Sequence, residues 1–198
     1  MAVELELLYS KPQVFDNVLP QQLYDQLVDA TRKIGWQFGW RAPGNSDARY
    51  WHHEVGFGEK ANVEDVSARV REHPLKPFVE FMDWLRSNLV PPETPILRYY
   101  LNGHTYGTDG WPHTDTDRTD ELTAILYLNP EWSGEWGGET VVFNEHGDIA
   151  GSVLPRANRL MTFPSNLLHA PRPLARACGA LRVVLVVKLG PPGGNRDG

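Results

Sequence analysis

Cysteine, long apolar runs and basic clusters are all scarce in this sequence of 198 residues. Cys178 is the only cysteine, so no disulfide can form within the chain. No apolar run approaches the ~20 residues that a helix needs to cross a bilayer. Residues 1–6, Met-Ala-Val-Glu-Leu-Glu, lack the basic and then apolar layout of a secretory signal peptide. We therefore expect a cytoplasmic protein from a reducing compartment.

Charge of one sign does not dominate the chain either. It has 19 Lys+Arg and 25 Asp+Glu, for a formal net charge of -6. Because no basic run stands out, neither a nucleic acid nor an anionic membrane is the expected partner. A small molecule or a peptide is the expected substrate.

The length suits one domain with a well-filled core. No linker-like stretch divides the middle, so we predict a single domain over residues 1–190. Within it, residues 1–95 would form a helical and aromatic support or lid region, and residues 96–190 a β core. Residues 191–198, Pro-Pro-Gly-Gly-Asn-Arg-Asp-Gly, cannot bury enough surface to order themselves, so we predict a flexible tail there.

The first half of the chain has the patterns of two helices and a hairpin. A leading strand or two is expected within residues 1–18. Pro20 suits the first turn of a helix, and apolar residues follow it at helical spacing up to Ile34. Residues 36–57 are aromatic and polar around a turn-like centre, which predicts a hairpin suited to a pocket wall. A second helix is expected over residues 77–89, and both helices would pack on the outside of a sheet.

Short strand-like segments separated by turn-forming residues fill the second half. They cover residues 96–101, 122–129, 139–143, 160–163 and 182–189. Strands and turns at this density predict a sandwich or a barrel. The predicted fold class is therefore mainly β with flanking helices.

His113 and Asp115 stand two positions apart, the spacing at which a β-strand presents both side chains on one face. The triplet alone is weak evidence, because seven histidines in a chain with about one acidic residue in eight give such triplets by chance. Two others occur, at residues 52–54 and 146–148. His169 follows His113 at an interval that leaves room for several strands. Two histidines and one carboxylate suit an Fe(II) site with open positions for oxygen chemistry.

Arg182 opens a strand whose two faces are both apolar, so this strand is expected to be buried on both sides. A buried guanidinium without a partner costs several kcal/mol. No acidic residue lies between His169 and Lys188. Either a carboxylate from elsewhere in the chain pairs with Arg182, or a bound carboxylate does, for which arginine offers two parallel donors.

The second half resembles the Fe(II)/2-oxoglutarate-dependent oxygenases, particularly their prolyl-hydroxylase-like branch. The resemblance rests on seven short motifs in the order found in that branch. They are Tyr-Leu-Asn-Gly at 100–103, His-Thr-Asp at 113–115, Ile-Leu-Tyr-Leu-Asn at 125–129, Gly-Gly-Glu-Thr at 137–140, Asn-Arg-Leu at 158–160 ahead of Phe163, His169 and Arg182. Each motif is weak by itself, and their shared order makes the resemblance strong.

The resemblance implies a double-stranded β-helix, the jelly-roll core of cupin-like proteins. It also implies Fe(II), 2-oxoglutarate and O2 as cofactor and cosubstrates. The implied site has three metal ligands and three residues around 2-oxoglutarate: His113, Asp115 and His169 on the metal, Arg182 on the distal carboxylate, Tyr127 hydrogen-bonded to it and Tyr100 beside the cosubstrate. The implied reaction is hydroxylation of an unactivated C–H bond with release of succinate and CO2.

Two segments depart from the family pattern. Residues 104–111 form an extended loop with glycine and aromatic residues ahead of His113, so the entrance to the site is expected to be remodelled. The interval from His169 to Arg182 is longer than usual and contains Arg172, a rival for the anion-binding role. Arg172 lies between two prolines, where a loop is expected, so Arg182 is preferred.

The substrate is expected to be an amino acid, a peptide residue or a natural-product intermediate. The side chains expected around it are aromatic, basic or imidazole groups, namely Trp111, Arg118, Trp51, His53 and Arg41. Core packing or a solvated hairpin would also explain these residues. The alternative functions are a protein-residue hydroxylase of the prolyl type, a cupin-like lyase, isomerase or hydrolase that uses the same ligands, and a non-catalytic metal-binding module.

Overall fold

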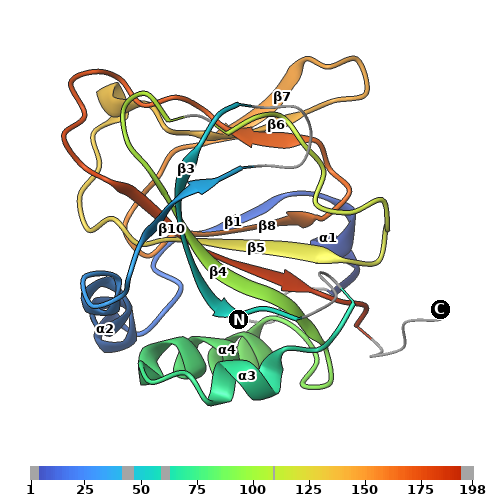
Figure 1. The fold of residues 1–198 in the computed structure, drawn as a ribbon. Helices are drawn as coiled ribbons and strands as arrows, with labels where there is room; N and C mark the ends of the chain where they lie inside the picture. Colours follow the sequence, from blue (N-terminus) through green and yellow to red (C-terminus); the bar gives the residue numbers. More distant parts are fainter. Residues whose placement is uncertain (1–4, 42–46, 59–62, 109, 193–198) are drawn as a thin grey trace.

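The fold consists of two antiparallel sheets, with helices on the outer side of the larger sheet (Figure 1). The computed structural model describes residues 5–41, 47–58, 63–108 and 110–192. The α-helices are α1 (Leu5–Ser10), α2 (Gln21–Thr31), α3 (Ser67–Arg71) and α4 (Lys76–Asn88). None of the helices in these ranges is long and apolar enough to cross a membrane.

Strands that are distant in sequence are neighbours in both sheets. The seven-stranded sheet has the spatial order β1 (Gln13–Phe15), β8 (Leu160–Pro164), β5 (Leu122–Tyr127), β10 (Arg182–Leu189), β4 (Ile96–His104), β3 (Tyr50–Gly56) and β2 (Gln37–Trp40). The three-stranded sheet has the order β7 (Ile149–Val153), β6 (Thr140–Phe143) and β9 (His169–Pro171). All of these pairs are antiparallel, which confirms the predicted mainly β fold with flanking helices.

Most of the predicted elements are confirmed. The predicted helices correspond to α2 and α4, and the aromatic hairpin corresponds to β2 and β3. The leading strand expected within residues 1–18 is β1, and residues 5–10 ahead of it form the helix α1, which packs against β8 and buries Leu8 completely. The short elements α3, β7 and β9 were not predicted. Of the predicted tail, Pro191 is buried in the structure, and residues 193–198 lie outside the described ranges.

The two faces of the larger sheet border different cores. On β10, the helix-facing residues are Val183, Leu185, Val187 and Leu189. The alternate residues Val184 and Val186 pack instead in a smaller core between the two sheets. Because side chains alternate along a strand, Arg182 and Lys188 share this second face. We call it the inner face, and it carries the functional residues described below.

The helix-facing core shows why α4 lies where it does. Phe78, Phe81, Met82 and Leu85 recur at helical spacing, and all four are fully buried against the sheet. Full burial of one such side chain contributes roughly 1.5–3 kcal/mol. This apolar layer packs against one face of the central strands β4 and β10. Their other face, the inner face, carries the site.

Candidate active site

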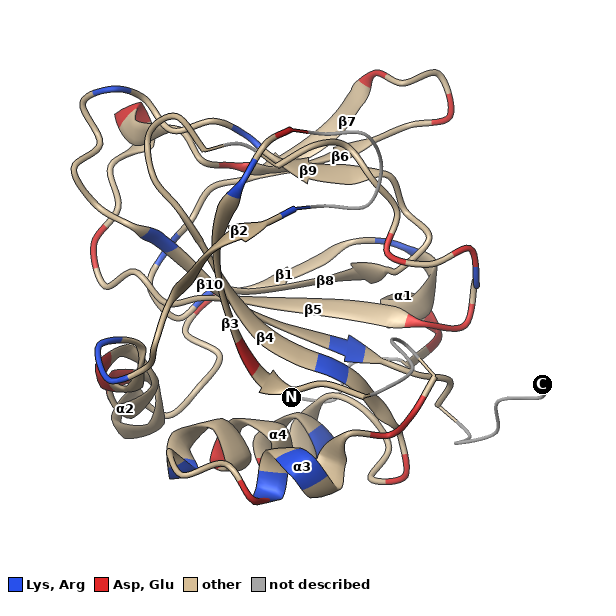
Figure 2. Cartoon of the chain, in the orientation of Figure 1, with Lys and Arg blue, Asp and Glu red and all other residues tan. Residues whose placement is uncertain are grey.

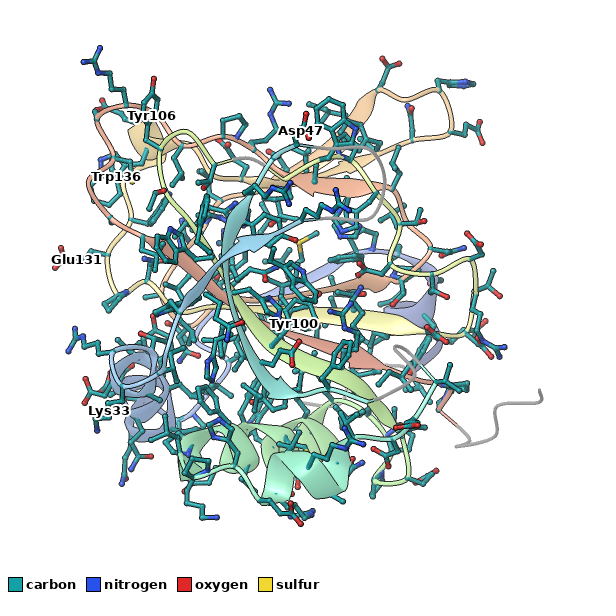
Figure 3. The ribbon with its side chains drawn as sticks, in the orientation of Figure 1. Lys33, Asp47, Tyr100, Tyr106, Glu131 and Trp136 are labelled. Carbon is teal, nitrogen blue, oxygen red and sulfur yellow. The ribbon has the colours of Figure 1, made fainter. Side chains whose placement is uncertain are left out.

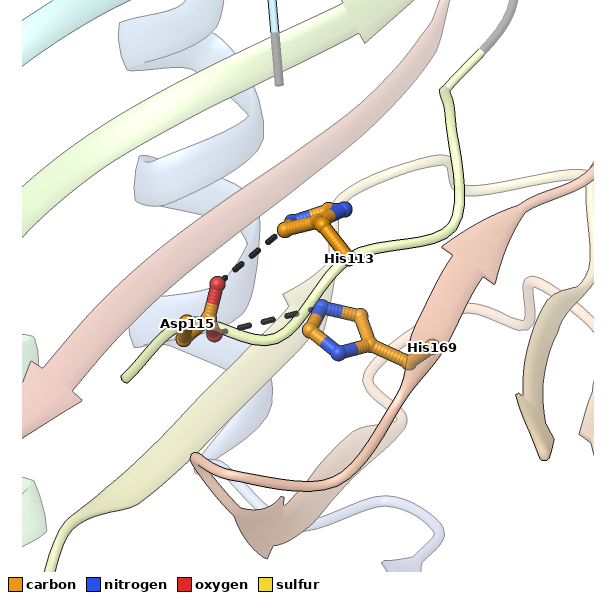
Figure 4. Close-up of side chains that lie close together, drawn as sticks. All are labelled: His113, Asp115 and His169. Carbon is orange, nitrogen blue, oxygen red and sulfur yellow. Dashed lines mark ion pairs between the residues drawn. The ribbon is translucent and has the colours of Figure 1, made fainter. Parts of the chain in front are cut away.

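His113 and His169 face each other across a two-residue antiparallel bridge. The N–H of His113 donates to the carbonyl of His169 over 3.0 Å, and the reverse hydrogen bond has the same length. The N–H of Asp115 donates to the carbonyl of Ser165 over 2.8 Å, which fixes the next turn of the same segment. The main chain therefore sets the positions of all three predicted ligands, and their side chains converge (Figure 4).

Potential ligand atoms of His113, Asp115 and His169 all lie within 4.8 Å of one another. Nδ1 of His113 lies 2.8 Å from the carbonyl of Trp111, and Nδ1 of His169 lies 2.9 Å from the carbonyl of Leu167. A ring nitrogen that contacts a carbonyl must carry the proton, so each imidazole keeps a lone pair on Nε2. Both Nε2 atoms lie near Asp115, at 3.5 Å for His113 and 3.9 Å for His169.

The carboxylate of Asp115 is held by a hydroxyl and an ammonium group. Oδ2 accepts a hydrogen bond of 2.6 Å from Thr123, and Oδ1 pairs with Nζ of Lys188. Burial disfavours the ionised carboxylate, but Lys188 and the two imidazoles outweigh it and hold the pKa of Asp115 well below its usual range. Burial lowers the pKa of His169 to about 4, against the opposing effect of Asp115. At neutral pH this cluster therefore offers an anion and a neutral imidazole.

This donor set fits a divalent transition metal. Two imidazoles and one carboxylate form a three-point group that leaves coordination positions open, as non-haem Fe(II) sites require. The carbonyls that fix the imidazole tautomers and the hydroxyl that orients Asp115 are the outer contacts expected around metal ligands. The competing triplet at 146–148 is unsuitable, because it lies in the β6–β7 turn with the His146 side chain 73% exposed.

The triad lies on the wall of a cavity of about 310 Å³ between the two sheets. The cavity is lined by Trp40, Arg41, Tyr50, Arg98, Tyr100, Asn102, His104, Gly110, His113, Asp115, Thr123, Ile125, Thr140, His169, Pro171, Val184, Val186 and Lys188. Tyr100 lies near the middle of the molecule, whereas Tyr106 and Trp136 lie at its periphery (Figure 3). The inner faces of β4, β5 and β10 thus form one side of the cavity, and the triad closes it from the smaller sheet.

Arg182 lies at the β6 end of this cavity, behind Thr140. Its Nε donates to the carbonyl of Gly138 over 2.6 Å, and an Nη donates to Oγ1 of Thr140 over 2.9 Å. The hydroxyl of Tyr127 also donates to Thr140, and the guanidinium carbon lies 5.4 Å from the centre of the Tyr127 ring. Among the described residues, no carboxylate forms an ion pair with Arg182.

The sequence motifs around Arg182 have a structural reason. Gly138 has φ +76°, and a Cβ there would come within 3.0 Å of Cδ of Arg182, so glycine allows the close approach. Asn129 accepts a hydrogen bond from the N–H of Val183 and donates one to the carbonyl of Leu181, each over 2.8 Å. The start of β10 is thereby fixed, and the guanidinium with it.

The predicted substrate residues are only partly brought to the cavity. Arg41 lines it, but Trp51 and His53 do not, because strand alternation turns their neighbours Tyr50 and His52 inward instead. Trp51 packs on Phe38, and His53 contacts the carbonyl of Gly35.

The other two predicted substrate residues also lie outside the cavity lining. Trp111 is 57% exposed, although its carbonyl orients His113. Arg118 forms ion pairs with Asp120 and Glu121 in its own loop. Local charge pairing within that acidic loop explains the position of Arg118.

Several residues of the site were not predicted. Thr123, Thr140, His104, Arg98 and Lys188 all line the cavity. Because alternate residues of a strand share a face, Arg98 and His104 lie on the same face as Tyr100, and this could have been inferred from the sequence. The same rule places Lys188 on the face of Arg182. The hydroxyl residues carry no comparable signal, because their roles depend on which strands pair.

Comparison with known proteins gives a family and a fold. Residues 96–187 match the model of the 2OG-Fe(II) oxygenase superfamily. This is the region that contains the triad, Tyr100, Tyr127 and Arg182. No curated protein matches the chain in sequence.

Solved structures share the fold at low identity. A prolyl hydroxylase from Trichoplax adhaerens, in complex with a hypoxia-inducible-factor peptide, has a TM-score of 0.65 and 17% identity, over 96% of this chain and 88% of that one. A prolyl-4-hydroxylase from Pseudomonas putida has a TM-score of 0.62 and 17% identity, over 94% of this chain and 96% of that one. HygX from Streptomyces hygroscopicus, with nickel and 2-oxoglutarate bound, has a TM-score of 0.63 and 15% identity, over 96% of this chain and 88% of that one.

The matched region, its jelly-roll core and the composition of the donor set agree with one another. They confirm the resemblance seen in the sequence, and they set aside the lyase and non-catalytic alternatives. Residues 96–187 belong to the 2OG-Fe(II) oxygenase superfamily, and the chain is a 2-oxoglutarate-dependent dioxygenase that uses Fe(II) and O2.

Proposed function

We propose that this dioxygenase hydroxylates an unactivated C–H bond of a small molecule. His113, Asp115 and His169 would hold Fe(II), and the observation that carries this assignment is the convergence of their ligand atoms on a cavity. Fe(II) bound there supplies O2 activation, coupled to the decarboxylation of 2-oxoglutarate. In the overall balance, substrate, O2 and 2-oxoglutarate give hydroxylated substrate, succinate and CO2.

Residues at the Arg182 end would hold 2-oxoglutarate. Arg182 supplies a buried positive charge, and Thr140 lies between the guanidinium and the cavity. A cosubstrate carboxylate that reached this end would neutralise a charge for which no described carboxylate is a partner. Burial raises the pKa of Tyr127, with Arg182 opposing, so the phenol stays protonated and can donate a hydrogen bond. Tyr100, on the inner face of β4, would flank the cosubstrate.

A small substrate is favoured by the size of the cavity. A volume of about 310 Å³ is at the lower end of the range of ligand pockets, and 2-oxoglutarate must share it with the substrate. An amino acid or another metabolite of similar size would fit beside the cosubstrate.

A succinate-release screen tests this function. The Fe(II)-loaded protein would be incubated with 2-oxoglutarate, ascorbate and pools of free amino acids, metabolites or peptides. We expect succinate formation that requires Fe(II) and rises with a small-molecule pool. Absence of succinate in every pool, together with no slow uncoupled release, would contradict the proposal.

Hydroxylation of a peptide residue is the second candidate function. Tyr106 and Trp111 are 58% and 57% exposed, and both belong to the segment that leads into His113. Exposed aromatic rings beside a site are suited to contact a peptide. A response to peptides and none to free amino acids in the same screen would favour this candidate.

A further inference from the structure

Arg98 lines the cavity together with Arg41, and it lies at the end opposite to Arg182, which stands behind Thr140. On β4 the inner face carries Arg98, Tyr100, Asn102 and His104, and all four line the cavity. In the antiparallel register, His104 lies opposite Arg182, and Arg98 lies opposite Lys188. Figure 2 shows the corresponding basic segments side by side on β4 and β10. The cavity therefore has a basic group at each end, separated by roughly 20 Å of strand at ~3.3 Å per residue.

Aromatic rings hold the guanidinium of Arg98. Its central carbon lies 4.8 Å from the centre of the Tyr100 ring, 5.2 Å from that of Phe57 and 5.5 Å from that of Trp40. Trp40 is itself stacked on His52 at 4.0 Å, with an angle of 5° between the rings. Such contacts attract a cation through the faces of the rings and fix its plane, but they satisfy none of its N–H donors.

Arg98 has no anionic partner in the part of the chain that the structure describes. It takes part in none of the ion pairs there, and its Nε is buried without a hydrogen-bond acceptor. Lys188 is the nearest comparable cation, and it is already paired with Asp115. A cavity-lining guanidinium with unused donors is an incomplete site, because arginine normally directs two parallel donors at one carboxylate.

We propose that Arg98 binds a carboxylate of the primary substrate, so that the enzyme acts on a small carboxylic acid such as a free amino acid. This inference rests on the proposed function and specifies its substrate class. A residue within a peptide chain has an amide where a free amino acid has its carboxylate. The Arg98 subsite would therefore discriminate against internal peptide residues and neutral metabolites.

The positions of Arg98 and Arg182 also separate the carboxylate of the substrate from that of the cosubstrate. The cosubstrate carboxylate belongs to the Arg182 end, and Asp115 lies at the level of Lys188, near the Arg98 end. A substrate anchored at Arg98 would therefore lie beside the metal ligands, on the side away from Arg182. Trp40 would border its remaining atoms, because it lines the cavity and its ring lies against the Arg98 guanidinium.

Binding to the protein loaded with Ni(II) and saturating 2-oxoglutarate tests the inference without turnover. Free amino acids and simple monocarboxylic acids would be compared with their matched carboxamides by the rise in melting temperature, and hits by calorimetric titration. We expect at least one acid to stabilise the protein and its amide not to. Arg98→Gln should weaken the acid about 10- to 100-fold and change 2-oxoglutarate affinity less than about threefold. Arg98→Lys should give an intermediate loss, because the charge stays but the paired donors are lost.

Arg71→Gln is the matched control, because Arg71 pairs with Asp83 on the helical side, far from the cavity, and its loss should leave acid binding unchanged. If no acid binds better than its amide, or if Arg98→Gln leaves acid binding unchanged, the inference is overturned. A loss of 2-oxoglutarate binding in Arg98→Gln equal to the loss of acid binding overturns it as well, and assigns Arg98 to the cosubstrate. Failure of the proposed function is distinct, because it requires that the Fe(II)-loaded wild type release no succinate.

Discussion

The two ends of the cavity hold a guanidinium in different ways. Arg182 is fully buried and donates to a carbonyl and a hydroxyl, so its orientation is fixed by the protein alone. Arg98 is only partly buried and is enclosed by rings, and its Nε has no acceptor. The first arrangement suits a ligand that is the same in every reaction cycle. The second leaves donors free for a ligand that the protein selects.

The largest effect is expected from the metal ligands. His113→Ala removes one imidazole of the metal site. Succinate formation should fall at least about a hundredfold with any substrate acid, because the reactions of 2-oxoglutarate and of the substrate depend on the same metal. Metal content and succinate release would be measured together. His146→Ala is the control, since it removes an imidazole from the other His-x-Asp triplet, in an exposed turn. Equal losses in the two variants would contradict the site.

A substitution of Arg182 should distinguish the ligand bound at one end of the cavity from the ligand bound at the other. Arg182→Gln is expected to raise the KM for 2-oxoglutarate about 10- to 100-fold, because the buried charge for the distal carboxylate is lost. The affinity of the substrate acid should change much less, the reverse of the Arg98→Gln pattern. Steady-state kinetics with each ligand varied in turn would show this. A normal 2-oxoglutarate KM in the variant would remove Arg182 from the cosubstrate site.

A stability measurement examines the Lys188 ion pair at the Arg98 end. Lys188→Met leaves the buried carboxylate of Asp115 unpaired in the metal-free protein, which should cost about 3 kcal/mol in unfolding free energy. With Ni(II) bound the cost should be smaller, because the metal compensates the same carboxylate. Urea unfolding with and without metal gives both values. A loss that does not depend on metal would show that Lys188 acts by packing alone.

The smallest effect concerns one histidine at each end. Burial lowers the pKa of His52 to about 4. Burial, with a smaller contribution from the charge of Arg182, lowers the pKa of His104 to about 3. The unfolded chain then binds more protons than the folded one below about pH 6.5, so stability is full above that pH and falls as pH decreases toward 4. In the metal-free protein, His52→Gln should reduce this slope. Arg182→Gln should raise the pKa of His104 only, as measured by NMR titration.

The sequence predicted the site better at the Arg182 end than at the Arg98 end. The resemblance covers His113, Asp115, His169, Tyr127 and Arg182, and the structure brings the three predicted metal ligands together. The roles of Tyr127 and Arg182 remain predictions that the variants above test. For Trp51 and His53 the prediction was wrong by one residue along the strand. Because successive side chains point to opposite faces of a sheet, such an error moves a side chain to the other face.

The Arg98 end depends on long-range pairing that local patterns do not specify. Arg98 meets Lys188 only because β4 pairs with β10, and it meets Trp40 only because β2 and β3 continue the same sheet. Alternation from Tyr100 would have placed Arg98 on the inner face, but not the rings around it. The helical state of residues 5–10 was missed for a similar reason, because it depends on packing against β8.

The bridge between His113 and His169 has a consequence for the order in which the enzyme matures. Strands β5 to β8 lie between the two histidines in sequence, so the bridge closes a long loop, and pairing of these strands lowers the entropic cost of closing it. Main-chain hydrogen bonds hold the segments that carry the three ligands. Folding should therefore precede iron loading, and the iron should be exchangeable in a chain that stays folded.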